Sequence, residues 1–212
     1  MSVLPLTPDE MLATTRAVRR RLDLTRPVER EMLDECLALA QQAPRASNVE
    51  SRAFVLVTDA EKRAALADLW RRGMERYLRR MPTVGPDEPR TSQERIFAGV
   101  QYLGDHLAEV PVHLIPCVHG RLDGKSALAQ SGAWGSIAPA TWSFMLAARA
   151  RGLGTCWTTF HLMYEEEAAD ILGIPYAEWT QIALVPVAHT LGTDFKPGPR
   201  EPLSAIAHWD GW

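Results

Sequence analysis

The chain has 212 residues, 46% hydrophobic and 23% charged, which is typical of a soluble globular protein with one substantial core. Its 23 Lys and Arg against 26 Asp and Glu give a formal net charge of -3, which argues against a nucleic-acid partner. Cys36, Cys117 and Cys156 show no Cys-x-x-Cys spacing, so they predict neither a disulfide framework nor a zinc site and favour the reducing cytoplasm. Asp9 and Glu10 stand where an export signal would need an apolar core.

One segment has the length of a membrane span. Residues 126–148 carry no charge and are long enough to cross a bilayer. They include Gln130, Ser131, Pro139 and Ser143, however, and this polarity favours a buried helix of a soluble protein.

The start of the chain is predicted to form two helices. Thr7-Pro8-Asp9-Glu10 has the pattern of a capping box with proline in the first helical turn, and we expect a helix from there to about Arg21. The arginines before Arg21 would then complement the dipole of its last turn. Pro27 opens a second helix, whose apolar residues recur at intervals of three and four, and Pro44 ends it.

A short strand and a capped helix follow. Residues 53–57 form an apolar run that predicts a buried strand, and Asp59 is placed to cap a third helix that reaches about Met81. The segment from Pro82 to Pro89 has no periodicity, which indicates a loop and the best candidate for a mobile lid.

The second half alternates helices and strands. A capping box at Thr91–Glu94 begins a helix to about Ala108, and a helix over Ser136–Ala150 that is apolar on every side is expected in the core or in a subunit interface. The other elements are a second strand at Val112–Val118, a third at Thr155–Phe160, a helix at Glu165–Leu172 and a fourth strand at Gln181–Ala188, in which Pro186 requires an edge or a bulge.

From Gly192 onward the chain is rich in proline and irregular. It ends in Trp209 and Trp212, which are costly to expose, so we expect this tail to be docked, either on its own chain or on another subunit. Strands interleaved with longer helices, without a repeat or a break in composition, predict a single α+β or α/β domain over residues 1–212.

Four blocks of residues carry the functional signal. They are Arg16-Ala17-Val18-Arg19-Arg20; the stretch from Ala43 through Pro44 and Asn48 to Phe54; Ser136-Ile137-Ala138-Pro139-Ala140 leading through Arg149 and Arg151 into Gly152-Leu153-Gly154-Thr155-Cys156-Trp157; and Lys196-Pro197-Gly198-Pro199-Arg200. In this order and at this spacing they resemble the FMN-dependent nitroreductase family. The resemblance implies a three-layer α/β/α sandwich with a mainly antiparallel central sheet, in an intertwined homodimer that holds FMN at the subunit interface.

The resemblance also implies roles for single residues. Arg16 and Arg200 would contact the FMN phosphate, with Lys196 assisting, because guanidinium groups bind a nearly dianionic phosphate bidentately. Arg19 would lie beside the pyrimidine edge of the ring, where negative charge collects on reduction, and would thereby set the redox potential. The other residues that the resemblance places at FMN are Ala17, Asn48, Pro139, Ala140, Gly154, Thr155 and either Thr158 or Thr159 on the strand that follows.

The chain departs from the family pattern inside these blocks, and the changes bear on individual hydrogen bonds more than on flavin binding itself. The substitutions are Ala17 for serine, Arg21 for an aromatic residue, Arg45 and Ala46 for two serines, and Glu50, Ser51 and Arg52 for Gln, Pro and Trp.

Other kinds of site have little support. Gly152-Leu153-Gly154 follows a helix and precedes a strand, which is the reverse of a dinucleotide fingerprint. The six histidines do not fall at metal-ligand spacing, and no serine lies in a Gly-x-Ser-x-Gly elbow. We therefore expect no metal, no membrane partner and no catalytic side chain, with the flavin N5 atom carrying the chemistry.

The expected function follows from the resemblance. It implies an oxidoreductase that takes hydride from NADH or NADPH and reduces a nitroaromatic, a quinone or another oxidised small molecule in a ping-pong reaction. Two alternatives stay open. One is a flavin-binding protein with little turnover that sequesters or senses, which the altered Pro44–Arg52 block favours; the other is a specialised flavoenzyme that acts on a dedicated metabolite.

Overall fold

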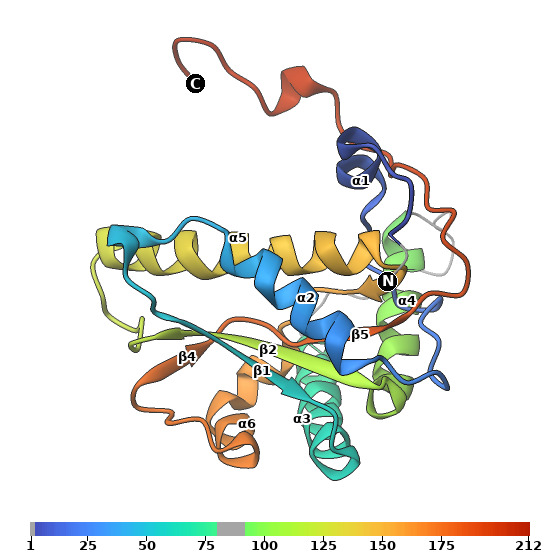
Figure 1. Ribbon diagram of the computed structural model, residues 1–212. Helices are drawn as coiled ribbons and strands as arrows, with labels where there is room; N and C mark the ends of the chain where they lie inside the picture. The colour runs from blue at the N-terminus through green and yellow to red at the C-terminus, as the bar shows by residue number, and fades with distance from the viewer. Residues whose placement is uncertain (1–2, 80–91) are drawn as a thin grey trace.

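The computed structural model describes residues 3–79 and 92–212, which form one five-stranded sheet with helices around it (Figure 1). The strand order is β1-β2-β5-β3, and β4 pairs with the C-terminal half of β2. Every pairing between these strands is antiparallel, so the predicted α+β class with a mainly antiparallel sheet is confirmed. The strands are β1 (Arg52–Val57), β2 (Val112–His119), β3 (Leu153–Thr155), β4 (Trp179–Gln181) and β5 (Val185–His189).

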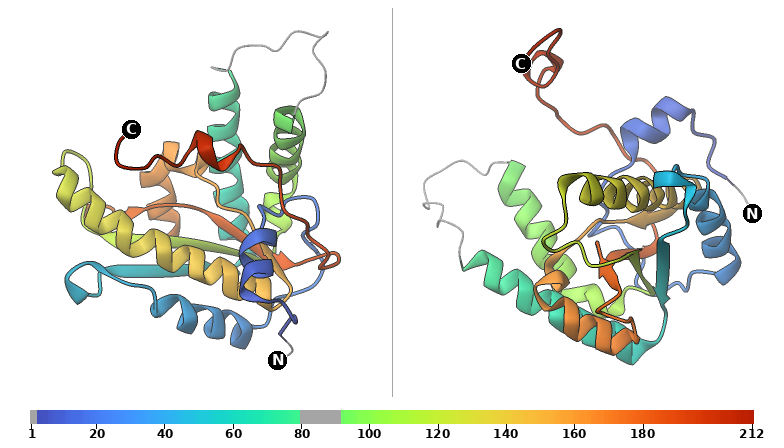
Figure 2. Two further views of the ribbon diagram at one scale, coloured as in Figure 1. Left: turned by 90° about the horizontal axis from the view of Figure 1, so that it is seen from above. Right: turned by 90° about the vertical axis from the view of Figure 1, so that its left-hand side faces the viewer.

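Helices pack against both faces of the sheet (Figures 1 and 2). On one face, α2 (Arg30–Gln41) and α5 (Ala127–Ala150) form a core cluster with Val112 and Leu114 of β2. On the other face, α3 (Ala60–Leu78), α4 (Ser92–His106) and α6 (Glu165–Leu172) share a second cluster with Ile115 and Cys117. Successive residues of β2 therefore point into different cores, which explains why its sequence is apolar almost without interruption.

Helix α1 (Pro8–Thr14) begins with the predicted capping box but ends seven residues before Arg21. Beyond it the backbone is drawn into a contact with β3, because Ala17 pairs with Thr155 and the amide of Val18 donates to the Thr155 carbonyl at 2.8 Å. The prediction that Arg16 to Arg21 form a helical last turn is therefore wrong. These arginines lie on an extended segment whose apolar residues, Val18 and Leu22, are buried.

Most other elements lie where the sequence predicts them, with shifted ends. Helix α2 begins after Glu29 rather than at Pro27, α3 is capped by the Asp59 side chain as expected, and α6 matches its predicted bounds. Helix α5 begins at Ala127, nine residues before the predicted start, because Ser126 caps it and the glycines that follow are tolerated inside the helix.

Two predicted strands are wrong in extent. The third ends at Thr155, and Phe160–Tyr164 is a 3-10 helix. The fourth is divided into β4 and β5, with Pro186 in β5 opposite His113 of β2. Pairing of β5 with β3 starts only at Val187, so β3 does not extend to the position of Pro186.

The C-terminal segment runs away from the body of the chain (Figures 1 and 2). After the short 3-10 turn Leu203–Ala205, Trp209 is 90% exposed and Trp212 is fully exposed, so this segment is not docked on its own chain. The predicted lid at Pro82–Pro89 and the start of the Thr91–Glu94 capping box lie outside the described residues. Within residues 3–79 and 92–212, no helix combines the length and apolarity that a membrane crossing requires.

Candidate functional site

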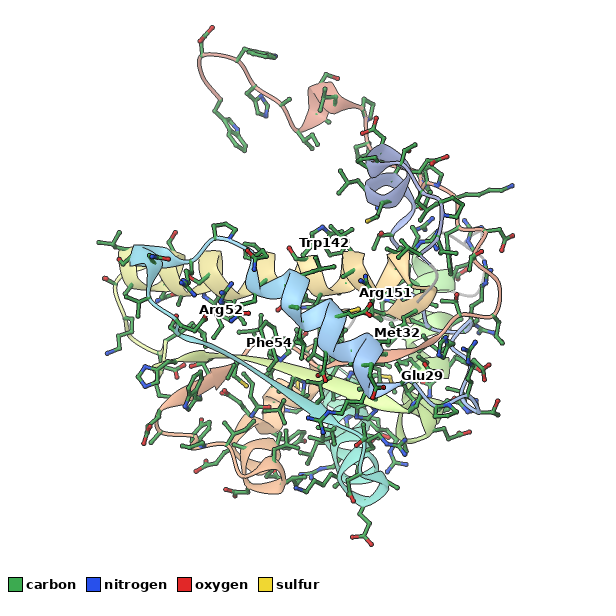
Figure 3. All side chains as sticks on the ribbon, in the orientation of Figure 1. Glu29, Met32, Arg52, Phe54, Trp142 and Arg151 are labelled. Atoms are coloured by element: carbon green, nitrogen blue, oxygen red, sulfur yellow. The ribbon has the colours of Figure 1, made fainter. Side chains whose placement is uncertain are left out.

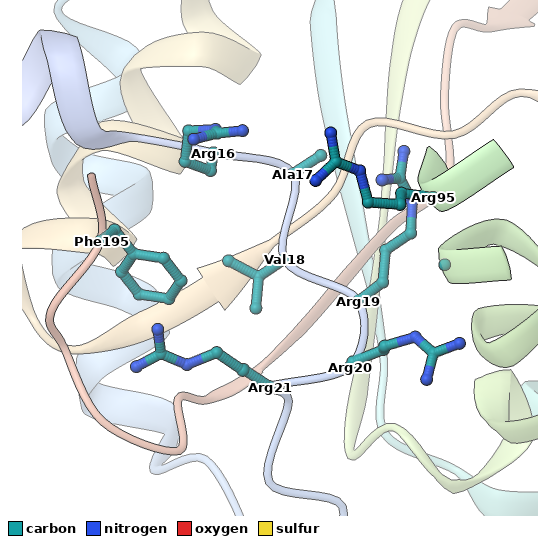
Figure 4. Close-up of a pocket in the computed structure, with 9 residues that line it drawn as sticks. Arg16, Ala17, Val18, Arg19, Arg20, Arg21, Arg95 and Phe195 are labelled. Atoms are coloured by element: carbon teal, nitrogen blue, oxygen red, sulfur yellow. The ribbon is translucent and has the colours of Figure 1, made fainter. Parts of the chain in front are cut away.

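The predicted phosphate-binding arginines lie at the C-terminal end of α5, where the Arg16–Arg21 segment runs beside β3 (Figure 4). Gly154 makes this packing possible. A Cβ atom on Gly154 would lie 2.8 Å from Thr190 Cγ2 and 3.0 Å from both Leu22 and Val18, so any side chain would push the segment away from the strand. The two glycines have different roles. Gly152 adopts the positive φ (75°) of the turn between α5 and β3, and Gly154 allows the close packing of the Arg16–Arg21 segment on β3.

The N-terminal segment and the Lys196–Arg200 part of the C-terminal tail meet at Arg16. Its Nη1 donates to the carbonyl of Lys196 at 2.7 Å, while the Lys196 side chain is exposed. A Cβ atom on Gly198 would lie 2.8 Å from Arg200 Nη1 and 3.1 Å from Arg16 Cζ, which puts both guanidinium groups against the same glycine. The structure therefore brings Arg16, Lys196 and Arg200 together as the sequence predicts.

A cleft of about 270 Å³ opens beside these groups (Figure 4). Its lining is strongly basic. Asp194 is bonded to Arg21 at 2.6 Å, whereas Arg16, Arg19, Arg20, Arg95 and Arg200 form no ion pair with any described residue. The residues that line it are Arg16, Ala17, Val18, Arg19, Arg20, Arg21, Arg95, Gly99 and Phe195.

The arginines of the cleft are positioned by carbonyl groups and apolar contacts. Arg20 donates to the carbonyl of Ala98 at 3.1 Å and lies over the Tyr102 ring at 5.3 Å. The Nε of Arg19 is buried and has no hydrogen-bond partner within the described part of the chain. A guanidinium group that forms no ion pair with a carboxylate keeps its positive charge, and it is therefore able to bind an anionic ligand.

Phe195 anchors the tail beside the cleft, and the sequence analysis missed it. Its ring lies between the guanidinium groups of Arg21 at 4.3 Å and Arg149 at 4.9 Å. Arg149 is only 4% exposed and donates to the carbonyl of Thr193 at 3.0 Å; its burial lowers its pKa. The neighbouring Lys196 was the only signal in the sequence that could have pointed to Phe195.

Arg95 and Gly99 of α4 were also missed. They lie four residues apart and therefore share one helical face, which packs against Arg19. Their spacing alone predicts nothing about a partner, so the sequence offered no signal that α4 would form one wall of the cleft.

Two predicted threonines lie near this end of the sheet but not in the cleft lining. Thr155 is buried and supplies the backbone carbonyl that holds the Arg16–Arg21 segment in place. The hydroxyl of Thr158 donates to the carbonyl of Leu184 at 2.6 Å, so it is engaged within the fold.

The remaining predicted residues lie toward the other end of α5. Asn48 belongs to the 3-10 turn Ala46–Asn48, whose Ala46 amide donates to Ser136 Oγ at 2.9 Å. From Ser136 to Ala150 the helix rises about 21 Å, at 1.5 Å for each of fourteen residues. Pro139 is half-buried and Ala140 is fully buried between the two ends. A single chain therefore does not bring Asn48 to the basic cleft.

The turn that carries Asn48 is held by an ion-pair cluster formed by residues that depart from the family pattern. Glu50 binds Arg45 and Arg52, each at 2.8 Å, and the Arg52 side chain is only 2% exposed (Figure 3). Hydrogen bonds from Arg52 and then Arg45 lower the pKa of Glu50 to about 2. Arg52 also donates to the carbonyls of Ala43 and Gln41, so this cluster closes the end of α2.

The comparisons with known proteins identify the family. The model of the nitroreductase family matches residues 12–189. The chain belongs to the nitroreductase family. Within the described part of the chain, no group of three or more His, Cys, Asp or Glu side chains could hold a metal ion.

Solved structures of low sequence identity share the fold. Iodotyrosine deiodinase bound to FMN and 3-iodo-L-tyrosine matches with a TM-score of 0.72 and 18% identity, over 96% of this chain and 99% of that one. A BluB-like flavoprotein from Clostridium difficile 630 matches with a TM-score of 0.72 and 17% identity, over 97% and 100%. The FMN and NADPH-dependent nitroreductase NfnB from Sphigopyxis sp. strain HMH matches with a TM-score of 0.70 and 21% identity, over 98% and 100%.

Proposed function

We propose that this member of the nitroreductase family is an FMN-dependent oxidoreductase. It takes reducing equivalents from NADPH or NADH and transfers them to a nitroaromatic, a quinone or another oxidised small molecule in a ping-pong reaction. The observation that carries the proposal is the basic end of α5, where Arg16 and Arg200 meet at Gly198, Arg16 and Arg19 line one cleft, and none of the three forms an ion pair with a described carboxylate.

The residues present fit FMN. Gly198 leaves room for Arg16 and Arg200 to approach the same point, where a phosphate with nearly two negative charges would match them. The buried Nε of Arg19 has no partner in the described structure, and an electron-rich ring edge would supply an acceptor for it. Lys196, Ala17 and Thr155 position this end of the site through their backbone.

When bound, FMN supplies the hydride acceptance and donation of the reaction. The protein contributes binding, orientation and charge. Arg16 and Arg200 hold the phosphate, and Arg19 stabilises negative charge at the ring edge. No side chain need donate or accept a proton, which is consistent with a cleft that is lined by arginines and apolar residues.

We further propose that the whole chain is one domain, a three-layer α/β/α sandwich, and that it acts as an intertwined homodimer. Two features support the dimer. A second copy could bring its Asn48 and Pro139 to the basic cleft, which the first copy cannot do with its own. Apolar side chains also lie exposed on α5 and in the tail, including Trp142 (Figure 3); they are Leu128, Trp134, Trp142, Leu203, Ile206, Trp209 and Trp212. Light scattering should give twice the chain mass of 23.6 kDa.

The cytoplasm is the proposed compartment because the three cysteines are unpaired and buried. NADPH and NADH oxidation by the purified protein, with a quinone and a nitroaromatic as acceptors, tests the function. We expect a yellow protein with flavin absorption bands and turnover with at least one nucleotide. A colourless protein that stays colourless with added FMN contradicts the proposal, whereas yellow protein without turnover favours a sequestering or sensing role.

A further inference from the structure

The basic cleft holds more positive charge than one flavin phosphate can match. Four arginines without an ion pair to any described residue line it, and Arg200 lies beside Arg16. A phosphate monoester carries nearly two negative charges, so its binding to Arg16 and Arg200 leaves about three guanidinium groups unmatched. Arg19 faces the proposed ring edge, and the surplus therefore lies on Arg20 and Arg95.

These two arginines line the cleft on either side of Arg19 (Figure 4). Arg20 reaches α4, where it bonds the carbonyl of Ala98 and lies over Tyr102. Arg95 comes from the same helix, one turn before Gly99. A Cβ atom on Gly99 would lie 3.5 Å from Cδ of Arg19, so this turn of α4 packs against the Arg19 side chain. Both side chains are exposed and line the same opening (Figure 4).

Among the residues that the structure describes, no carboxylate forms an ion pair with Arg20 or Arg95. Asp194, on the tail side, is bonded to Arg21. Glu94 of α4 does not line the cleft. Unpaired guanidinium groups on both sides of a cleft attract anions and hold them by charge-assisted hydrogen bonds.

We propose that Arg20 and Arg95 form a second anion subsite, which binds a phosphate or carboxylate carried by the small-molecule substrate rather than by the flavin. This inference rests on the proposed function. It names the substrate class as anionic, with two possible sources: the 2′-phosphate of NADPH, or a carboxylate on the molecule that is reduced.

Calorimetric titration of the purified, flavin-loaded protein distinguishes these sources. One pair of ligands is NADP⁺ and NAD⁺, which differ by the 2′-phosphate, and the other is 4-nitrobenzoate and 4-nitrobenzamide. We expect the more negatively charged member of at least one pair to bind at least tenfold more tightly, which corresponds to about 1.4 kcal/mol. The pair that shows this preference identifies the source of the anion.

The variant R20Q/R95Q should reduce that preference at least fivefold. The matched control is R30Q/R71Q, which removes the same charge from exposed sites on α2 and α3 and should leave the preference unchanged. A preference below tenfold in both pairs, a preference that R20Q/R95Q retains, or an equal loss in the control overturns the proposal.

Two further readings make the result decisive. In the unmodified protein, raising the salt concentration should weaken the anionic ligands and leave 4-nitrobenzamide unchanged, and this measurement does not depend on how the variants fold. The visible spectrum of the same samples reports the flavin. If the flavin is absent, the proposed function fails on the spectrum, whereas equal binding of the paired ligands to yellow protein defeats only the anion subsite.

Discussion

Two groups of arginines lie at opposite ends of α5, and their surroundings differ. At the N-terminal end, Arg45 and Arg52 share the carboxylate of Glu50, and the Arg52 side chain is buried. At the other end, Arg16 and Arg20 donate to backbone carbonyls, and Arg19 has a buried nitrogen with no partner among the described residues. The arginines of the first group share a carboxylate within the fold, and those of the second have no carboxylate partner among the described residues.

The difference separates arginines that hold the fold together from arginines that can hold a ligand. A carboxylate neutralises a guanidinium and occupies its donors, whereas a carbonyl fixes its position and leaves the charge unmatched. The sequence pattern treats both groups alike, as arginines inside family blocks. Of the two groups, the one at the C-terminal end of α5 has no carboxylate partner among the described residues, and its guanidinium groups are therefore the better candidates for binding an anion.

The largest expected effect is on FMN affinity, at the C-terminal end of α5. Replacing Arg16 and Arg200 together with alanine should weaken FMN binding by at least about 100-fold, because each lost charge-assisted bond contributes roughly 1.5 to 3 kcal/mol. Equilibrium dialysis measures the affinity. The melting temperature of the flavin-free protein should stay the same or rise, since these arginines match no carboxylate of the described fold. Unchanged flavin retention would remove the phosphate role.

At the N-terminal end of α5, where Glu50 pairs with Arg45 and Arg52, Glu50→Gln should destabilise the fold itself. The variant leaves Arg52 buried with carbonyl partners only, and we expect a loss of about 1 to 2 kcal/mol in the free energy of unfolding, moderated because Glu50 is 42% exposed. Urea denaturation of flavin-free protein measures it. Glu31→Gln on α2, which breaks no ion pair of the described structure, is the control and should change stability by less than about 0.5 kcal/mol. Equal stability of E50Q and the parent would show that the ion pairs of Glu50 with Arg45 and Arg52 do not stabilise the fold.

The same cluster predicts a pH dependence. The pKa of Glu50 is lowered from about 4.5 to about 2 in the folded state, so its contribution is fully present above about pH 4.5 and is lost as the pH falls toward 2. The stability difference between the parent and E50Q should therefore be constant from pH 5 to 7 and shrink in acid. Denaturation at several pH values tests this, and a difference that grows in acid would contradict the assignment.

The smallest expected effect concerns the redox potential. Replacing Arg19 with alanine removes a cation from the proposed ring edge and should lower the two-electron midpoint potential by on the order of 30 mV, or 1.4 kcal/mol. Potentiometric titration of the flavin-loaded variant measures the shift. An unchanged potential would mean that Arg19 serves the fold or the phosphate instead.

Capping residues and glycines in the sequence correctly predicted the ends of the helices that they begin or end. The side chain of Asp59 caps α3, and Glu165–Leu172 has its predicted bounds because acidic residues begin it and Gly173 ends it. The end of α1 could not be predicted in this way. Its capping box is present, but hydrogen bonds to β3, far along the chain, draw the following residues out of the helix. Helix α5 begins nine residues before its predicted start at Ser136, because the Ser126 side chain caps it and Gly132 and Gly135 do not interrupt it.

The candidate site was predictable to a similar degree. The resemblance placed Arg16 and Arg200 together across most of the chain, and the structure brings them together. It also named Asn48, which lies at the far end of α5. Arg95 and Phe195 could not be found, because their part in the cleft depends on the packing of α4 and the tail against a loop that the sequence analysis took for a helix.

The central claim is that the unmatched arginines at the end of α5 bind a phosphate. Titration of the flavin-free protein with FMN and with riboflavin, which lacks only that phosphate, tests it most directly through the quenching of flavin fluorescence. We predict that FMN binds at least 100-fold more tightly than riboflavin and that high salt narrows the gap. Equal affinities for the two flavins would contradict the account.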